Sequence, residues 1–191
     1  MERRTSPRTA PAFEAAVDTL RGTRLRSEVR VEPVAPPKRM APHTYALTAD
    51  VGDHAATGRL VLLHDPAGQA AWQGAFRLVT YVSAPLEPDI AGDPLLLSVG
   101  WAWLTEALTG RDAPYSAASG TVTRVASESF GGMAGEPATA DIEIRASWTP
   151  LEPDLSPHML AWGDLLATAA GLQPLPAGVV AIPSPRGVTR R

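Results

Sequence analysis

The residues that come nearest to chemical machinery lie in the stretch TRVASESFGGMAGEPATADIEIRASW, residues 123 to 148. Ser127 or Ser129 could serve as a nucleophile, with the amides of the following glycines cradling an anion. A nucleophile elbow, however, needs glycines on both sides of its serine and a strand that leads into a helix. Here the glycines follow both serines, and strand alternation points Glu128 away from them. We therefore expect a hairpin and no serine hydrolase site, with a glycine nest for an anion as the alternative.

The hairpin is predicted from the alternation of apolar and polar residues after the glycine turn, which is typical of a strand with one wet face. This strand, at 138–149, is expected to pair with the threonine-rich segment 119–129 across the turn FGGMAGEP. If paired residue numbers sum to 267, apolar side chains meet on one face and charged side chains on the other. This register pairs Val125 with Ile142, and Arg124 with Glu143.

Two histidines and a carboxylate form the second candidate site. Alternation predicts strands at 43–51 and 56–64. A register in which paired numbers sum to 107 places His43 opposite His64, with Asp65 beside them, and zinc accepts such a ligand set. A slip of one residue would put the two imidazoles on opposite faces, so ordinary edge histidines are the alternative and no metal or other cofactor is assigned.

A third strand of this meander is predicted at 74–84, preceded by Trp72 and containing Tyr81. Aromatic and imidazole side chains gathered at one end of a sheet would line a small-molecule pocket between the sheet and its helices. The candidate pocket residues are therefore His43, His64, Asp65, Trp72 and Tyr81.

Three helices are expected to cover the sheet, because apolar residues recur at helical spacing in the segments 11–22, 93–110 and 156–171. Trp101 lies about 200° around the second helix from Trp103, so the two indoles cannot face the same layer. Trp101 is therefore either a second core contact or a candidate partner surface. His158, in the first turn of the third helix, is expected to be a neutral surface residue.

Composition restricts the classes of function. The 191 residues contain no cysteine, which excludes disulfides, thiolate metal sites and thiol nucleophiles. The absence of any run of about 18 apolar residues predicts a cytoplasmic protein with no membrane contact. The ends are basic, whereas residues 41–180 carry five basic and fifteen acidic side chains. Weak nucleic-acid binding through the basic tails is an alternative function, which the acidic body opposes by repelling DNA.

Four stretches of the chain resemble a known family: TGRLVLLHDPAGQAAWQGAFRLVTYV, DPLLLSVGWAWLTEAL, SGTVTRVASESFGG and ADIEIRASWTP. They look like an actinobacterial family of about this length that is known only as a domain of unknown function. The resemblance covers residues 10 to 180 and implies no activity, ligand or catalytic residue. Apart from an additional strand predicted at 24–32, the element order is similar to that of secretion-chaperone-like two-layer proteins, which implies binding of other proteins.

These patterns predict an α+β protein with a mostly antiparallel sheet of five to six strands and about three helices on one face. We expect a flexible basic tail at 1–9, a single domain at 10–172 and an extended, proline-rich basic tail at 173–191. The absence of a convergent nucleophile, base and orienting group favours a non-enzymatic protein-binding or regulatory module, with another protein or a second copy as its partner. The alternative is a small-molecule-binding protein or enzyme that uses the pocket described above.

Overall fold

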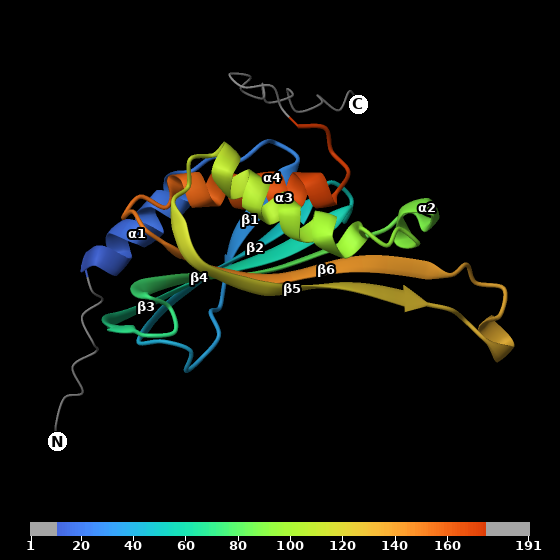
Figure 1. The fold of residues 1–191 in the computed structure, drawn as a ribbon, viewed down its shortest axis with the longest axis horizontal. Helices are drawn as coiled ribbons and strands as arrows, with labels where there is room; N and C mark the ends of the chain where they lie inside the picture. Colours follow the sequence, from blue (N-terminus) through green and yellow to red (C-terminus); the bar gives the residue numbers. More distant parts are fainter. Residues whose placement is uncertain (1–10, 175–191) are drawn as a thin grey trace, which may run out of the picture.

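The structure, a computed structural model, describes residues 11–174 and consists of one antiparallel sheet with helices on one face (Figure 1). The strand order is β1-β2-β3-β4-β6-β5, which confirms the α+β prediction. The predicted tails fall mainly outside the described residues. In chain order the elements are α1 Pro11–Gly22, β1 Val29–Val34, β2 His43–Val51, β3 Ala56–Gln69, β4 Gly74–Pro85, α2 Pro88–Ala91, α3 Leu96–Gly110, β5 Tyr115–Ser127, the short 3-10 helix η1 Gly131–Met133, β6 Thr139–Pro150 and α4 Ser156–Ala169.

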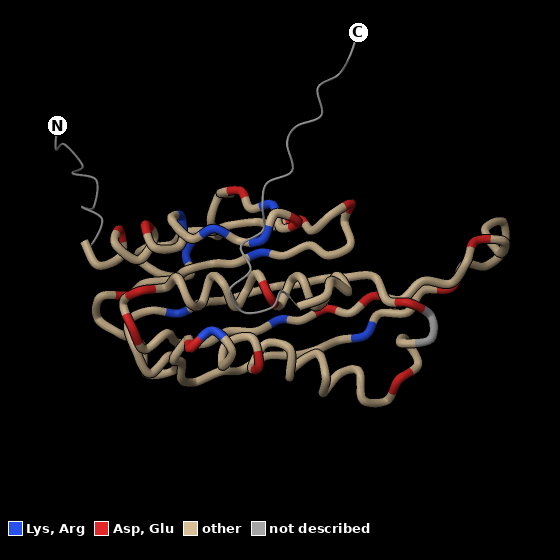
Figure 2. Tube along the Cα trace, turned by 90° about the horizontal axis from the view of Figure 1, so that it is seen from above, with Lys and Arg blue, Asp and Glu red and all other residues tan. Residues whose placement is uncertain are grey.

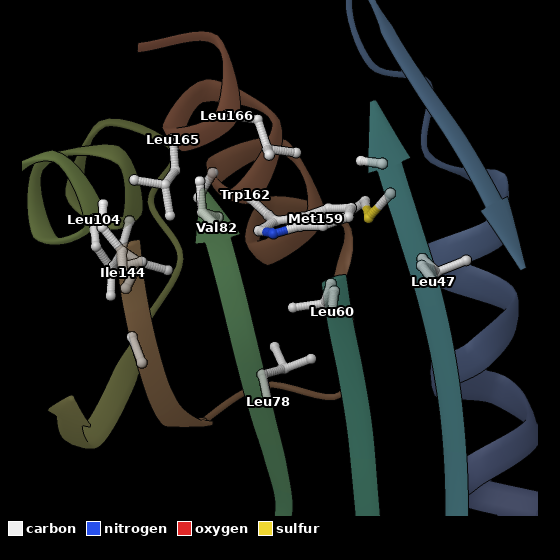
Figure 3. Close-up of a cluster of buried hydrophobic side chains, with 14 of the residues drawn as sticks. Leu47, Leu60, Leu78, Val82, Leu104, Ile144, Met159, Trp162, Leu165 and Leu166 are labelled. Carbon is white, nitrogen blue, oxygen red and sulfur yellow. The ribbon is translucent and has the colours of Figure 1, made fainter. Parts of the chain in front are cut away.

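The core lies between the sheet and α1, α3 and α4, as Figure 3 shows for the apolar side chains under α3 and α4. Two fully buried tryptophans occupy this layer, Trp148 from β6 and Trp162 from α4. The indole N–H of Trp162 donates to the Thr80 hydroxyl at 2.9 Å. The indole N–H of Trp148 donates to Nδ1 of His158 at 3.1 Å. Both buried indole donors are therefore satisfied, as burial of a polar group requires.

Two glycines let the helices approach the sheet closely. A Cβ on Gly58 of β3 would lie 2.6 Å from the Leu166 side chain of α4. A Cβ on Gly100 of α3 would lie 2.9 Å from the Ile142 side chain of β6. Real Cβ atoms do not reach such distances, so these positions set the spacing between the helical layer and the sheet.

The predicted β2–β3 register is confirmed, because His43 pairs with His64. The predicted β5–β6 register was wrong by one residue: Arg124 pairs with Ile142, and paired numbers sum to 266. The guanidinium of Arg124 donates to the carbonyl of Ala91 at 2.6 Å, on the side of the helices. At this end of the hairpin both faces of β5 are largely exposed, so the apolar pattern of β5 does not specify its register against β6.

Three further local predictions are corrected. The strand predicted at 24–32 begins only at Val29, because the chain before it carries Leu25 onto Gly163 of α4. The second helix starts at Leu96, and Asp93 instead accepts the Leu95 amide in a turn. His158 is fully buried, since its imidazole accepts the hydrogen bond from Trp148.

No helix among residues 11–174 lies on the opposite face of the sheet (Figure 1). The loop between β1 and β2 and the hairpin turn between β3 and β4 lie on this open side (Figure 1). Trp72, from the β3–β4 turn, packs on a small cluster formed by Ala46, Val61 and Leu63. Within residues 11–174 no helix is long and apolar enough to cross a membrane.

Candidate functional site

The open face carries a groove of about 640 Å³. Its floor is formed by β3, β4, β6 and β5, and the β1–β2 loop supplies Pro37 and Met40 as its rim. Val61, Val79 and Tyr81 provide an apolar surface on the floor. A concave, mostly apolar surface of this size is the usual form of a small-molecule site.

Arginine side chains lie among the apolar residues of the open face. Residues 41–180 contain five arginines, and three of them, Arg59, Arg77 and Arg145, project from the open face on three different strands. Arg59 donates to the Ala35 carbonyl at 2.9 Å, which fastens the rim loop to the sheet. The sheet therefore concentrates positive charge on one surface of an otherwise acidic body.

Arg145 is held in place by its neighbours on the open face. Its guanidinium lies 5.0 Å from the centre of the Tyr81 ring and 2.6 Å from a carboxylate oxygen of Glu143. Tyr81 in turn donates its hydroxyl proton to Glu143 at 3.0 Å. These contacts keep the pKa of the Glu143 carboxyl below its ordinary value. Arg145 is therefore oriented along the groove floor while about half of its side chain stays exposed.

Arg77 is the most unusual group at this site because only 6% of it is exposed. It donates to three hydroxyls, those of Thr149 at 3.1 Å, Ser119 at 3.2 Å and Ser147 at 2.8 Å. None of the ion pairs found within residues 11–174 includes Arg77. Burial lowers the pKa of its guanidinium. A buried charge without a counter-ion is costly, so its retention next to a groove is a sign of function.

Arg77 contacts the groove indirectly, through two of the hydroxyls to which it donates. Ser119 and Ser147 both line the groove, and their hydroxyls lie 3.5 Å apart. Each hydroxyl that accepts a hydrogen bond from Arg77 can direct its own proton outward. The serines therefore present donors to a ligand that are polarised by the cation behind them.

The charge balance at the groove is positive. Arg59 and Arg145 line the groove and Arg77 lies behind it, whereas the nearby carboxylate of Glu143 is already engaged by Arg145 and Tyr81. The rim loop adds Lys38 and Arg39 next to the rim residues. In Figure 2 the acidic positions are spread over the whole molecule, on helices, strands and loops. An anion is therefore the ligand that this surface attracts most strongly.

The structure brings His43 and His64 together but places them on the helix-covered face. Their rings stack with centroids 5.5 Å apart, between Phe13 of α1 and Phe76 of β4. Burial and the neighbouring His43 lower the pKa of His64. In the part of the chain that the structure describes, no group of three His, Asp or Glu side chains has the spacing to hold a metal ion. The pair is accounted for as an aromatic stack at the end of the core.

The other predicted pocket residues lie apart from the histidines. Asp65 accepts hydrogen bonds from the Ala67 amide and the Gln69 side chain. Trp72 covers the open face, where its carbonyl accepts the Thr149 hydroxyl proton. Of the five, only Tyr81 lines the groove.

The structure also shows the surroundings of Trp101 and of the β5–β6 hairpin. Trp101 is partly buried and its ring lies over Gly120 of β5. Ser127 is exposed and pairs with Thr139 at the end of the β5–β6 ladder, which confirms the hairpin. The basic tails lie outside residues 11–174, so nucleic-acid binding stays a prediction.

Sequence reasoning missed Arg59 and Arg145, which line the groove, and Arg77, which lies behind it. A signal was present for two of them, because Arg59 and Arg77 each interrupt an apolar run in the acidic part of the chain. Only the sheet order, which sets β6 beside β4, shows that the three share one surface.

The model of a family described as "Protein of unknown function (DUF3000)" matches residues 9–180. Searches of the curated proteins and of the solved structures gave no match.

Proposed function

The chain belongs to the DUF3000 family, and we propose that it binds an anionic small molecule with an apolar body in the open-face groove. The observation that carries this proposal is the buried Arg77, whose charge is held by hydroxyls that line the groove and by no carboxylate. The pocket predicted between the sheet and the helices is replaced by one on the opposite side.

The groove has an apolar end and a polar end, which would contact different parts of a ligand. Val61, Val79 and Met40 form an apolar end near the rim loop. Ser119 and Ser147 form a polar end over Arg77, and Arg145 lines the same groove beside Tyr81. An anion at the polar end would accept hydrogen bonds from serine hydroxyls and an arginine, while its body covers the apolar floor.

The test uses two fluorescent probes of similar shape and different charge. 1-Anilinonaphthalene-8-sulfonate carries a sulfonate on an apolar body, and N-phenyl-1-naphthylamine is its neutral counterpart. We expect the sulfonate to bind the intact chain more tightly. Arg145→Gln should weaken sulfonate binding about tenfold, since a hydrogen bond to a charged group contributes about 1.5–3 kcal/mol. Binding of the neutral probe should change little.

Arg30→Gln is the matched control. Arg30 lies on the same open face in β1, outside the groove, and pairs with Asp50. Its replacement should leave sulfonate affinity unchanged, and the thermal midpoints of both variants should confirm folding. Equal affinity for the two probes, or equal effects of the two variants, would remove the basis of this proposal.

A further inference from the structure

The two edges of the sheet are protected to different degrees. β1 is six residues long, contains Pro33 and carries Arg30 and Glu32, which are features that discourage pairing with another strand. β5 is thirteen residues long, has no proline and contains a single charged residue, Arg124. Its outer backbone groups are unpaired in the described sheet. β5 is therefore the edge that can accept a further strand.

Exposed apolar side chains gather at the same end of the molecule. Among the described residues, nine large hydrophobic side chains are exposed, and seven of the nine fall between positions 90 and 133. Figure 1 shows this end as the projecting β5–β6 hairpin with α2 above it. The seven are Ile90, Leu95, Leu97, Val99, Val125, Phe130 and Met133.

Helix α3 extends this apolar surface along the edge strand. The Trp101 ring lies over Gly120 of β5. Leu97 precedes Trp101 by one helical turn, so it lies on the same side of α3, and 46% of it is exposed. A strand added to β5 would therefore find an apolar wall next to it.

We propose that β5 pairs antiparallel with β5 of a second copy of this chain, about a two-fold axis at Ala126. Charge complementarity selects this partner and this register. An axis at Ala126 pairs residues whose numbers sum to 252, which sets Arg124 opposite Glu128 of the second copy. Symmetry repeats the pair, so two opposite-charge contacts form and no like charges meet.

The register also gives a role to the exposed Phe130. Its backbone is extended, with φ −127° and ψ 167°, so the chain continues in strand-like form past the end of β5. In the proposed pairing Phe130 of one copy lies opposite Val122 of the other, on the side of the helices. There it would cover part of the apolar surface that includes Leu97.

A charge swap tests the pairing. Sedimentation equilibrium of the full chain should give twice the chain mass of 20.1 kDa. Arg124→Glu and Glu128→Arg should each weaken the dimer about tenfold or more, because each sets like charges opposite one another. The double variant restores opposite charges and should restore the dimer. Arg30→Glu, on the protected β1 edge, should leave the mass unchanged.

A second variant disrupts the edge strand itself. Val125→Lys places a lysine in the exposed edge next to the axis and should give a monomer that keeps the far-UV circular dichroism of the intact chain. A monomeric intact chain at 100 µM would overturn the proposal. So would a dimer that survives Val125→Lys, or a double variant that stays monomeric; the latter two results would indicate another interface. Sulfonate binding in the groove should not depend on these variants.

Discussion

The buried basic groups on the two faces of the sheet differ in their charge state. On the helix-covered face His158 is fully buried, and burial lowers its pKa to about 4, so the imidazole is neutral at neutral pH. On the open face Arg77 is nearly as buried but remains charged, because a guanidinium stays protonated in proteins. His158 on the covered face loses its charge by releasing a proton. Arg77 on the open face stays charged and is hydrogen-bonded by hydroxyl groups. This difference distinguishes the face that forms the core from the face on which we propose the binding groove.

The largest expected effect on stability comes from shortening a buried side chain on the covered face. Ile144→Ala removes a fully buried side chain from the core and should lower the free energy of unfolding by about 2–5 kcal/mol. Val79→Ala, on the open face of β4, should cost only about 1 kcal/mol, because Val79 is half-buried. Urea unfolding of both variants measures the ratio. Equal losses would mean that the open face contributes to the core as much as the covered one.

The pH dependence of stability tests the covered face directly. The pKa of His158 is about 4 in the folded protein and about 6.5 in an unfolded chain. Between these values the unfolded chain binds more protons, so stability should fall as pH falls from about 6.5 to 4. The loss should approach about 3 kcal/mol, a figure that already includes the nearby Asp154, which acts to raise the pKa of His158.

His158→Phe provides the control for this pH effect. It removes the titrating group and leaves the Trp148 indole N–H without its acceptor, so stability at pH 7 should fall by about 1–3 kcal/mol. The slope of stability between pH 6.5 and 4 should become shallower. A variant with an unchanged slope would assign the pH dependence to other groups.

On the open face, replacing the buried basic residue should not lower stability as it does at His158. Arg77→Met replaces a buried charge with an apolar side chain of similar length, so stability should stay within about 1 kcal/mol of the intact chain or rise. Ser147→Ala, in contrast, leaves the charge buried with one partner fewer and should cost about 1–2 kcal/mol. Sulfonate binding should weaken in both. If Arg77→Met destabilises more than Ser147→Ala, the arginine is structural.

Much of the fold could be predicted because its signals are local. Alternation located β2 and β3, and the register that it favoured, with His43 opposite His64, is the one observed. The β5–β6 register was missed because the β5 residues around Arg124 are exposed on both faces of the strand. His158 was assigned to the surface because nothing near it in sequence shows that Trp148 packs against it.

The groove could not be predicted for a different reason. Arg59, Arg77 and Arg145 come from three strands, and the last is separated from the second by 68 positions in the chain. Only the placement of β6 beside β4 brings their side chains to one surface. Alternation tells which residues share a face of one strand, but it does not tell which strands are neighbours.

The smallest expected effect concerns two serines of the same hairpin that differ in surroundings. Ser127 is exposed at the end of β5, and none of the hydrogen bonds found for described side chains involves its hydroxyl. Ser127→Ala should therefore change the free energy of unfolding by no more than about 0.5 kcal/mol and leave sulfonate binding intact. Ser147→Ala is its matched comparison, because that hydroxyl holds Arg77. Thermal unfolding and probe titration of the two variants side by side measure the difference. If Ser127→Ala stays folded and loses a cellular function that Ser147→Ala retains, the reactive group belongs to the hairpin tip and the arginine groove is not the site.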